Sequence, residues 1–146
     1  MKNIKKLFVL VLIGISIYFY IQYNRNDTGF PSEHAGKNNS VLNAVHDRAK
    51  DIQVQGEGKV SRILSDDNYG NRHQRFILRL SPEHTVLIAH NIDLAPGISK
   101  LKKGDVVQFY GEYEWNSKGG VVHWTHHDSK GHHKSGWLKY KGRIYK

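Results

Sequence analysis

Apolar and polar residues alternate along several short stretches of this 146-residue chain, and this period of two predicts β-strands. The clearest case is residues 72–80 (RHQRFILRL), in which every second side chain from Phe76 to Leu80 is apolar. Four further stretches have a strand pattern and are bounded by turn residues: 53–64, 84–90, 105–115 and 121–128. Two shorter glycine-flanked stretches, 136–140 and 142–146, follow them.

Five main strands with this spacing predict an all-β domain over residues 40–146, folded as a small five-stranded barrel similar to the oligonucleotide- and oligosaccharide-binding (OB) fold. Gly56 and Gly58 let the first strand bend, as a strand in a closed barrel must. The segment NIDLAPGISKLKKGD interrupts the strands between the third and the fourth. A simple open sheet is the alternative.

One short helix and a linker are predicted ahead of the barrel. Ser40 can cap a helix that runs to Asp51, with its apolar residues close to one face: Val41, Leu42, Val45 and Ala49. Residues 24–39 are polar and contain glycine and proline, which predicts a flexible linker. The alternative is that this linker continues through the helical stretch.

The first 23 residues predict a membrane anchor. Residues 7–23 carry no charge, and they follow three lysines within the first six residues. The positive-inside rule then leaves the N-terminus in the cytoplasm of a bacterium and places the C-terminal domain in the periplasm, held by a single pass of the inner membrane. A cleaved signal peptide is the alternative, but the run ends in bulky aromatic residues rather than the small ones that a cleavage site needs.

Composition narrows the possible chemistry. The chain has no cysteine, which excludes thiol nucleophiles and thiolate metal sites. Its formal net charge of +9 suits an anionic ligand, such as phosphate, a lipid headgroup or another envelope component, and solubility alone is an equal explanation of this charge. Export argues against intracellular nucleic acid as a partner.

The stretch HWTHHDSKGHH, residues 123–133, holds five of the ten histidines. If the strand continues to Asp128, then His126 and Asp128 share a face, and the turn at Lys130–Gly131 brings His132 back toward them. Nitrogen and oxygen ligands of this kind suit Zn²⁺. The three residues are therefore candidate metal ligands for Zn²⁺, although a hydrogen-bonded polar hairpin is the favoured interpretation of this stretch.

Two histidine–aspartate pairs are candidates for catalysis. His90 and Asp93 are three residues apart at the end of the third strand, and His126 and Asp128 lie in the histidine-rich stretch. In each pair the imidazole would be a base and the carboxylate its orienting partner, in the hydrolysis of a phosphodiester. The alternative is that these side chains satisfy backbone groups at strand ends.

A basic, histidine-rich rim is predicted to bind the anionic ligand. Its members are His73, Arg75, Trp115, His123 and Trp124. No nucleophile, phosphate-binding loop or strong metal motif is present in the sequence. A membrane-anchored binding module is therefore the favoured function, and the hydrolase is the alternative.

Three segments carry a family resemblance: GEYEWN, GGVVHWTHHD and the Gly136–Trp137 pair. With the upstream HQRFILRL and IAHNIDLAP, they resemble the bacterial domain-of-unknown-function family 3465, from about Gln53 to the end of the chain. The resemblance implies a short bacterial protein with an N-terminal hydrophobic segment, and it brings no activity with it. Where the family pattern leads us to expect proline after HHD, this chain has Ser129, which loosens the turn.

Overall fold

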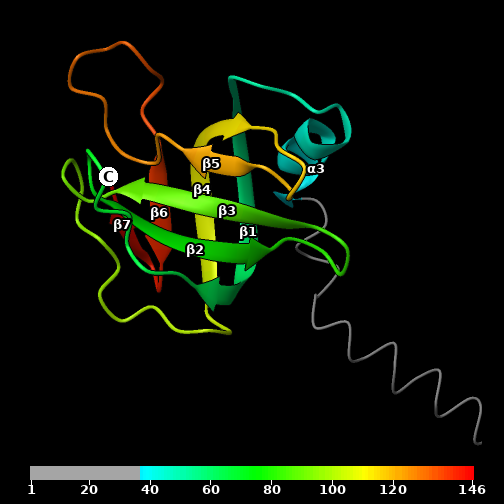
Figure 1. Cartoon of the computed structure of the whole chain (residues 1–146), viewed down its shortest axis with the longest axis horizontal. Coiled ribbons are helices and arrows are strands. Elements are labelled where there is room, and N and C mark those ends of the chain that lie inside the picture. The colour runs from blue at the N-terminus through cyan, green and yellow to red at the C-terminus, as the bar shows by residue number, and fades with distance from the viewer. Residues whose placement is uncertain (1–36) are drawn as a thin grey trace, which may run out of the picture. The chain divides into compact units, whose positions relative to one another are not determined.

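The computed structural model describes residues 37–146 (Figure 1). The predicted membrane segment, residues 7–23, and the predicted linker up to residue 36 lie outside the described residues. Within residues 37–146, no helix has the length and apolar character needed to cross a membrane.

Seven strands in residues 37–146 form one sheet that closes on itself (Figure 1). They are β1 (Ile52–Ile63), β2 (His73–Arg79), β3 (Thr85–Asn91), β4 (Val106–Glu114), β5 (Val121–His123), β6 (Trp137–Tyr140) and β7 (Arg143–Tyr145). Their order is β1-β2-β3-β5-β4-β6-β7, and a second pairing of β1 with β4 closes the first five into a barrel. Only β3 and β5 pair in parallel among these strands. The predicted all-β, five-stranded closed barrel is therefore confirmed, and the β6–β7 hairpin extends it beside β4.

Strand β1 contributes to both sides of the barrel. Residues 52–59 pair with β4, and residues 59–63 pair with β2. Two glycines lie where the neighbouring strands approach closely: a Cβ on Gly56 would be 2.5 Å from the ring of Phe109, and one on Gly58 would be 2.9 Å from the Cβ of Leu78. No other residue fits these positions without displacing a neighbour.

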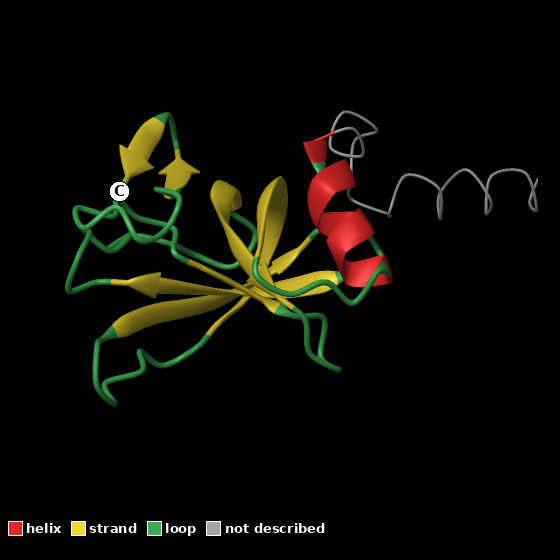
Figure 2. Ribbon diagram, turned by 90° about the horizontal axis from the view of Figure 1, so that it is seen from above, coloured by secondary structure: helices red, strands yellow, loops and turns green. Residues whose placement is uncertain are grey.

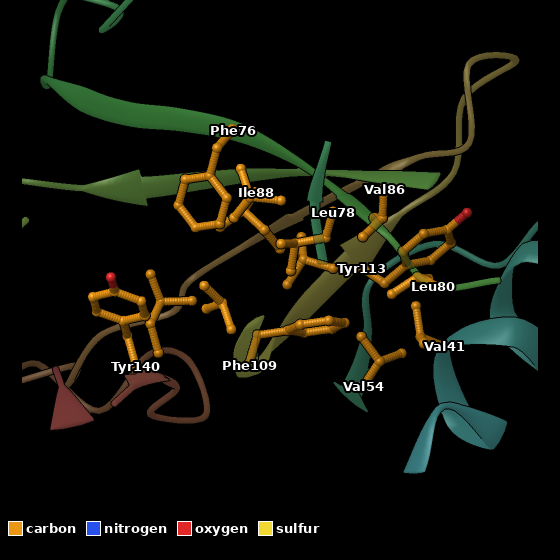
Figure 3. Packing of buried hydrophobic residues seen from close by; sticks show 14 of the residues in the cluster. Val41, Val54, Phe76, Leu78, Leu80, Val86, Ile88, Phe109, Tyr113 and Tyr140 are labelled. Carbon is orange, nitrogen blue, oxygen red and sulfur yellow. The ribbon is translucent and has the colours of Figure 1, made fainter. Parts of the chain in front are cut away.

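Apolar side chains fill the inside of the barrel (Figure 3). On β2, Phe76 and Leu78 are fully buried, whereas Arg79 is exposed, as the alternation predicts. On β4, Phe109 and Tyr113 are fully buried in the same core. Burial of each large apolar side chain contributes roughly 1.5–3 kcal/mol, so this core is the main source of the domain's stability.

A short helix, α3 (Asn39–His46), covers one end of the barrel (Figure 2). The sequence predicts a helix from Ser40 to Asp51, but the helix ends five residues earlier, and the chain adopts a left-handed conformation at Arg48 (φ 52°). Ser40 does not cap it, because its hydroxyl instead donates to the carbonyl oxygen of Gln55 at 2.8 Å.

Asn38, directly before α3, joins the helix to the barrel. Its buried side-chain nitrogen donates to the carbonyl oxygens of Glu57 (2.9 Å) and Leu80 (3.2 Å), and its side-chain oxygen accepts from the N–H of Glu57 (2.7 Å). Val41 and Ala44 are buried behind it in the core. Asn38 thus belongs to the folded domain, although its polar surroundings in the sequence place it in the linker.

The predicted strand 121–128 is wrong in its second half, because β5 ends at His123. Trp124 has a left-handed conformation (φ 50°), which breaks the strand. Residues 124–136, here called the His-rich loop, then extend outward before β6 begins (orange in Figure 1). Gly136 closes this loop by donating its N–H to the carbonyl oxygen of His126 at 2.8 Å.

Candidate functional site

An open cleft of about 350 Å³ lies on the outer face of the barrel, over β2, β3 and β5. Its lining residues come from these strands, the end of β4 and the turn after β1: Asp67, His73, Arg75, Ala89, Glu114, Val121 and His123. Alternation places His73 and Arg75 on the same face of β2, and the strand register sets Arg75 opposite Ala89. The parallel pairing of β3 with β5 brings His123 to the same wall. This feature is called the sheet cleft.

Three of the five residues predicted to bind a ligand line the sheet cleft, namely His73, Arg75 and His123. These residues are far apart in the sequence and come together only through the strand pairings. Trp115 and Trp124, the other two, do not line it. Three members of the predicted rim therefore lie together on strands, and their binding of a ligand stays a prediction.

Neighbouring groups hold the charged side chains of the sheet cleft in place. Nε and Nη2 of Arg75 donate to the carbonyl oxygen of Ser65 at 3.1 and 3.0 Å, and Nη1 lies 3.8 Å from the carboxylate of Asp67. Glu114 forms an ion pair with Lys50 at 3.3 Å. The cleft therefore presents one fixed guanidinium group together with carboxylates that can accept hydrogen bonds.

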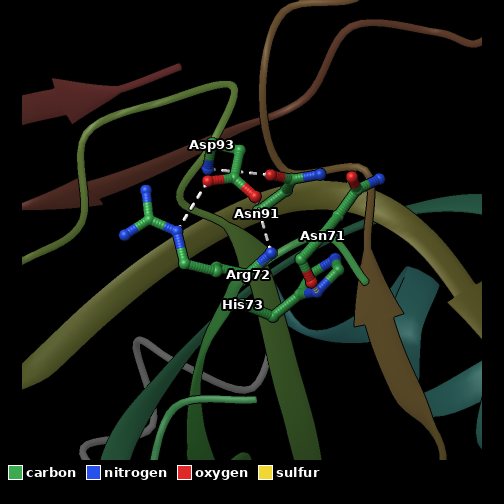
Figure 4. Close-up of polar contacts among 5 residues, drawn as sticks. All are labelled: Asn71, Arg72, His73, Asn91 and Asp93. Carbon is green, nitrogen blue, oxygen red and sulfur yellow. Dashed lines mark hydrogen bonds and ion pairs between the residues drawn. The ribbon is translucent and has the colours of Figure 1, made fainter. Parts of the chain in front are cut away.

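A polar network fixes His73 at the start of β2 (Figure 4). Its Nδ1 lies 2.8 Å from the carbonyl oxygen of Asn71, so Nδ1 carries the hydrogen and donates it to this oxygen. Asp93 accepts hydrogen bonds at 2.7 Å from both the N–H and the Nε of Arg72, and its own N–H donates to Asn91. The bonds from Arg72 lower the pKa of Asp93. Asp93 thus ties the start of β2 to the end of β3.

His90, the predicted catalytic partner of Asp93, is fully buried in the barrel wall. Its Nε2 lies 3.2 Å from the carbonyl oxygen of Pro96, and its Nδ1 lies 2.8 Å from the hydroxyl of Thr125. A carbonyl oxygen only accepts, so Nε2 donates and Nδ1 accepts the hydroxyl hydrogen. Burial lowers the pKa of His90 to about 4, which keeps the imidazole neutral. The predicted His90–Asp93 pair does not form, because both side chains bond elsewhere.

Asp128 organises the His-rich loop. Its carboxylate accepts the backbone N–H groups of Lys130 at 2.9 Å and His133 at 2.7 Å, and its own N–H donates to the hydroxyl of Ser135. The hydrogen bonds from His133 and Lys130 lower the pKa of Asp128 to about 2. The carboxylate is therefore committed to loop structure, and the predicted His126–Asp128 catalytic pair is not formed.

The predicted metal ligands His126, Asp128 and His132 do not form a ligand set. The prediction required the strand to reach Asp128, whereas β5 ends at His123. His126 is buried with its Nδ1 2.9 Å from the carbonyl oxygen of His127, while His132 is exposed. No group of three histidine or carboxylate side chains in the described part of the chain is placed to hold a metal ion.

A carboxylate missed by the sequence reasoning, Glu112, lies between two histidines at the edge of the sheet cleft. The β4–β5 register sets Glu112 opposite His123, and its carboxylate lies 3.6 Å from Nε2 of His123 and 3.3 Å from Nδ1 of His133. The ring of His133 stacks on Trp124, with centroids 3.7 Å apart. Burial lowers the pKa of His123 despite this carboxylate.

The remaining predicted ligand residue, Trp115, contacts the segment that follows α3 and does not line the sheet cleft. Its backbone N–H donates to the carbonyl oxygen of Ala49 at 3.0 Å, and the guanidinium of Arg48 lies 5.2 Å from its ring centroid. It therefore fastens the segment after α3 to the barrel. Asp67, Glu114 and His133 were also missed, since only the strand pairings and turns bring them near the cleft.

The fold and the sheet cleft together define a small β-barrel protein with an open polar cleft on its outer wall. The chain belongs to the family described as "Protein of unknown function (DUF3465)", whose profile matches residues 29–146. The predicted family resemblance is thereby confirmed. No curated protein matches the chain.

Proposed function

We propose that this protein is an OB-like binding module that holds an anionic ligand in the sheet cleft. The strand order supports the likeness, because β1-β2-β3-β5-β4 closes through β1 and contains one parallel pair, β3 with β5. OB barrels bind their ligands on the outer face of strands 2 and 3 and on the neighbouring loops. The sheet cleft occupies the corresponding surface.

The observation that carries this proposal is the convergence of His73, Arg75 and His123 on one open cleft. By contrast, His90 is buried with both ring nitrogens bonded inside the protein, and both carboxylate oxygens of Asp128 accept backbone N–H groups. A set of outward side chains on rigid strands suits binding, because strands hold such groups in fixed geometry.

The charges of the cleft narrow the ligand to an anion that also carries hydroxyl groups. Arg75 and His73 can hold a carboxylate, while Asp67 and Glu114 would repel a simple polyanion but accept hydrogen bonds from hydroxyls. Ala89 offers a small apolar surface between them. An acidic sugar combines all of these features, and oligosaccharides are a known ligand class of OB barrels.

We further propose that the domain meets this ligand in the cell envelope, outside the bacterial inner membrane. The uncharged run of residues 7–23 behind three lysines and the absence of cysteine support this placement. An envelope polysaccharide would then be within reach of the tethered domain.

The test is a calorimetric titration of the full-length chain, in neutral detergent micelles, with trigalacturonate and with the neutral sugar maltotriose. We expect trigalacturonate alone to bind, and Arg75→Gln to weaken it by about tenfold through loss of a charge-assisted contact. Arg79→Gln is the matched control, since Arg79 is on the same strand but outside the sheet cleft. Equal binding of both sugars, or equal weakening by both variants, would contradict the proposal.

A second candidate is hydrolysis of a phosphodiester, and the position of Glu112 favours it. Glu112 accepts a hydrogen bond from Nδ1 of His133 at 3.3 Å, which directs Nε2 away as a base that can take a proton from water. Release of p-nitrophenolate from bis(p-nitrophenyl) phosphate tests this idea. We expect Glu112→Gln to slow it at least about a hundredfold, whereas Glu114→Gln should not; no release above buffer would rule the hydrolase out.

A further inference from the structure

A second cleft, of about 380 Å³, lies beside the β6–β7 hairpin. In Figure 2 this hairpin stands on the side of the barrel away from α3. The cleft is lined by the hairpin and by the loop before β4: Ser99, Lys100, Tyr140, Lys141, Arg143 and Tyr145. Half of these residues are cations and none is acidic, in contrast to the sheet cleft. It is called the hairpin cleft.

Aromatic rings position two cations of the hairpin cleft, and the carboxylate of Asp105 also acts electrostatically on one of them, Lys141. The ammonium of Lys141 lies 5.0 Å from the ring centroid of Tyr140, and the guanidinium of Arg143 lies 5.2 Å from that of Tyr145. An aromatic face holds a cation in place but leaves its charge available to a ligand. Within residues 37–146, neither of these cations nor Lys100 forms an ion pair with a carboxylate.

The walls of the hairpin cleft are tied together by Tyr140. Its hydroxyl contacts the carboxylate of Asp105 at 2.7 Å and the carbonyl oxygen of Lys100 at 3.4 Å, which joins β6 to the loop before β4. Asp105 also accepts the N–H of Lys102 at 2.8 Å. This carboxylate is therefore held at the base of the loop, and it is not among the lining residues.

The turn of the hairpin fixes the spacing of the two hairpin cations. Tyr140 pairs with Arg143, and the two residues between them, Lys141 and Gly142, both have positive φ (49° and 79°). This is the tight turn that matches the twist of a hairpin, in which asparagine or glycine is usual at the first position. The turn therefore puts Lys141 at its first central position, one residue before Gly142 and two before Arg143.

We propose that the hairpin cleft binds a phosphate group. The planar guanidinium of Arg143 matches two phosphate oxygens, and the ammonium groups of Lys100 and Lys141 can contact the remaining ones. The absence of an acidic lining residue favours a multiply charged anion, which the sheet cleft would repel. The phosphate can come from a lipid headgroup or from a soluble compound, and the chemistry of recognition is the same.

The test uses the full-length chain in dodecyl maltoside micelles with two probes, inorganic pyrophosphate and phosphatidylglycerol added to the micelles. We expect the double variant Lys141→Gln/Arg143→Gln to weaken pyrophosphate binding by at least about tenfold, since two charge-assisted contacts are lost. The control is Lys130→Gln/Lys134→Gln, which removes the same charge from the His-rich loop. Far-UV circular dichroism checks that each variant keeps its β-sheet.

The lipid arm identifies the source of the phosphate. Shifts of the Gly142 and Arg143 amide signals on addition of phosphatidylglycerol, absent with phosphatidylcholine and in the hairpin double variant, point to a headgroup. Pyrophosphate binding without these shifts points to a soluble phosphate. The proposal is overturned if neither probe binds, if both double variants weaken binding equally, or if Arg75→Gln abolishes pyrophosphate binding. Trigalacturonate binding should be unchanged in the hairpin variant, so the sheet-cleft proposal stands or fails separately.

Discussion

The His-rich loop and the sheet cleft both contain histidines, but they use them in opposite ways. In the loop, which has no regular secondary structure, Asp128 accepts backbone N–H groups and His127 bonds to Ser135. In the sheet cleft, β2 and β3 satisfy each other's backbone groups along the strands. The side chains of His73 and Arg75 each bond one carbonyl oxygen, of Asn71 and Ser65, and still line the open cleft. A polar side chain thus keeps some of its polar atoms available for a ligand mainly where regular strands satisfy the surrounding backbone.

The largest expected effect comes from Gly136, which closes the His-rich loop against β4. A Cβ there would lie 2.1 Å from the carbonyl oxygen of Trp124 and 2.4 Å from that of Tyr110, and backbone cannot move aside easily. We expect Gly136→Ala to lower the free energy of unfolding by about 3 kcal/mol or more. Gly131→Ala in the same loop, where the added Cβ meets no atom within 4 Å, should cost only about 1 kcal/mol. Similar losses in denaturant titrations of the two variants would mean that the loop is not packed as described.

The next effect, on the pH dependence of the free energy of unfolding, distinguishes the buried His90 from an exposed histidine. The folded-state pKa of His90 is lowered by burial to about 4, whereas an unfolded histidine titrates near 6.5. Between these values the unfolded chain binds more protons, so stability falls as pH decreases from 6.5 to 4, by at most about 3 kcal/mol from this residue. Unfolding midpoints measured across this range should show a flatter dependence for His90→Gln. His132 is exposed, so His132→Gln should leave the pH dependence of the unfolding midpoint unchanged from that of the unmodified chain.

A smaller, local effect is expected at Asp128. Its lowered pKa means that its contribution is fully present above the ordinary aspartate pKa and is lost as pH falls toward about 2. Asp128→Ala removes the acceptor for two backbone N–H groups, so hydrogen exchange at Lys130 and His133 should become faster at neutral pH. In Asp128→Ala, hydrogen exchange in β2 should stay unchanged. In the control variant Ser129→Ala, exchange should stay unchanged throughout the domain. Uniform acceleration over the whole barrel in Asp128→Ala would contradict a role confined to the loop.

The barrel could be predicted from the sequence because its signals are local. The alternation in residues 72–80 indicates which side chains of that strand face the core. Gly56 and Gly58 indicate where the first strand bends. The length of the helix was harder to predict, because the chain turns at Arg48, whose guanidinium contacts the ring of Trp115 on the barrel. The anchor over residues 7–23 stays a prediction.

The site could be predicted only in part, because it depends on strand register. His73, Arg75 and His123 were chosen for their chemistry, and the pairing of β2, β3 and β5 brings them together. The sequence around His126 has the pattern of a strand, which is why the strand was predicted to reach Asp128. The left-handed conformation of Trp124 instead ends β5 at His123. Glu112 was missed because its partner on the neighbouring strand is visible only once the register is known.

The measurement that tests the central claim most directly is a comparison of two double histidine variants in trigalacturonate binding. His73→Gln/His123→Gln removes two imidazoles from the sheet cleft, and His127→Gln/His132→Gln removes two from the His-rich loop. We predict at least about tenfold weaker binding for the first variant, with little change in its unfolding midpoint, and unchanged binding for the second. Loss of binding in the loop variant with retention in the cleft variant would contradict the account.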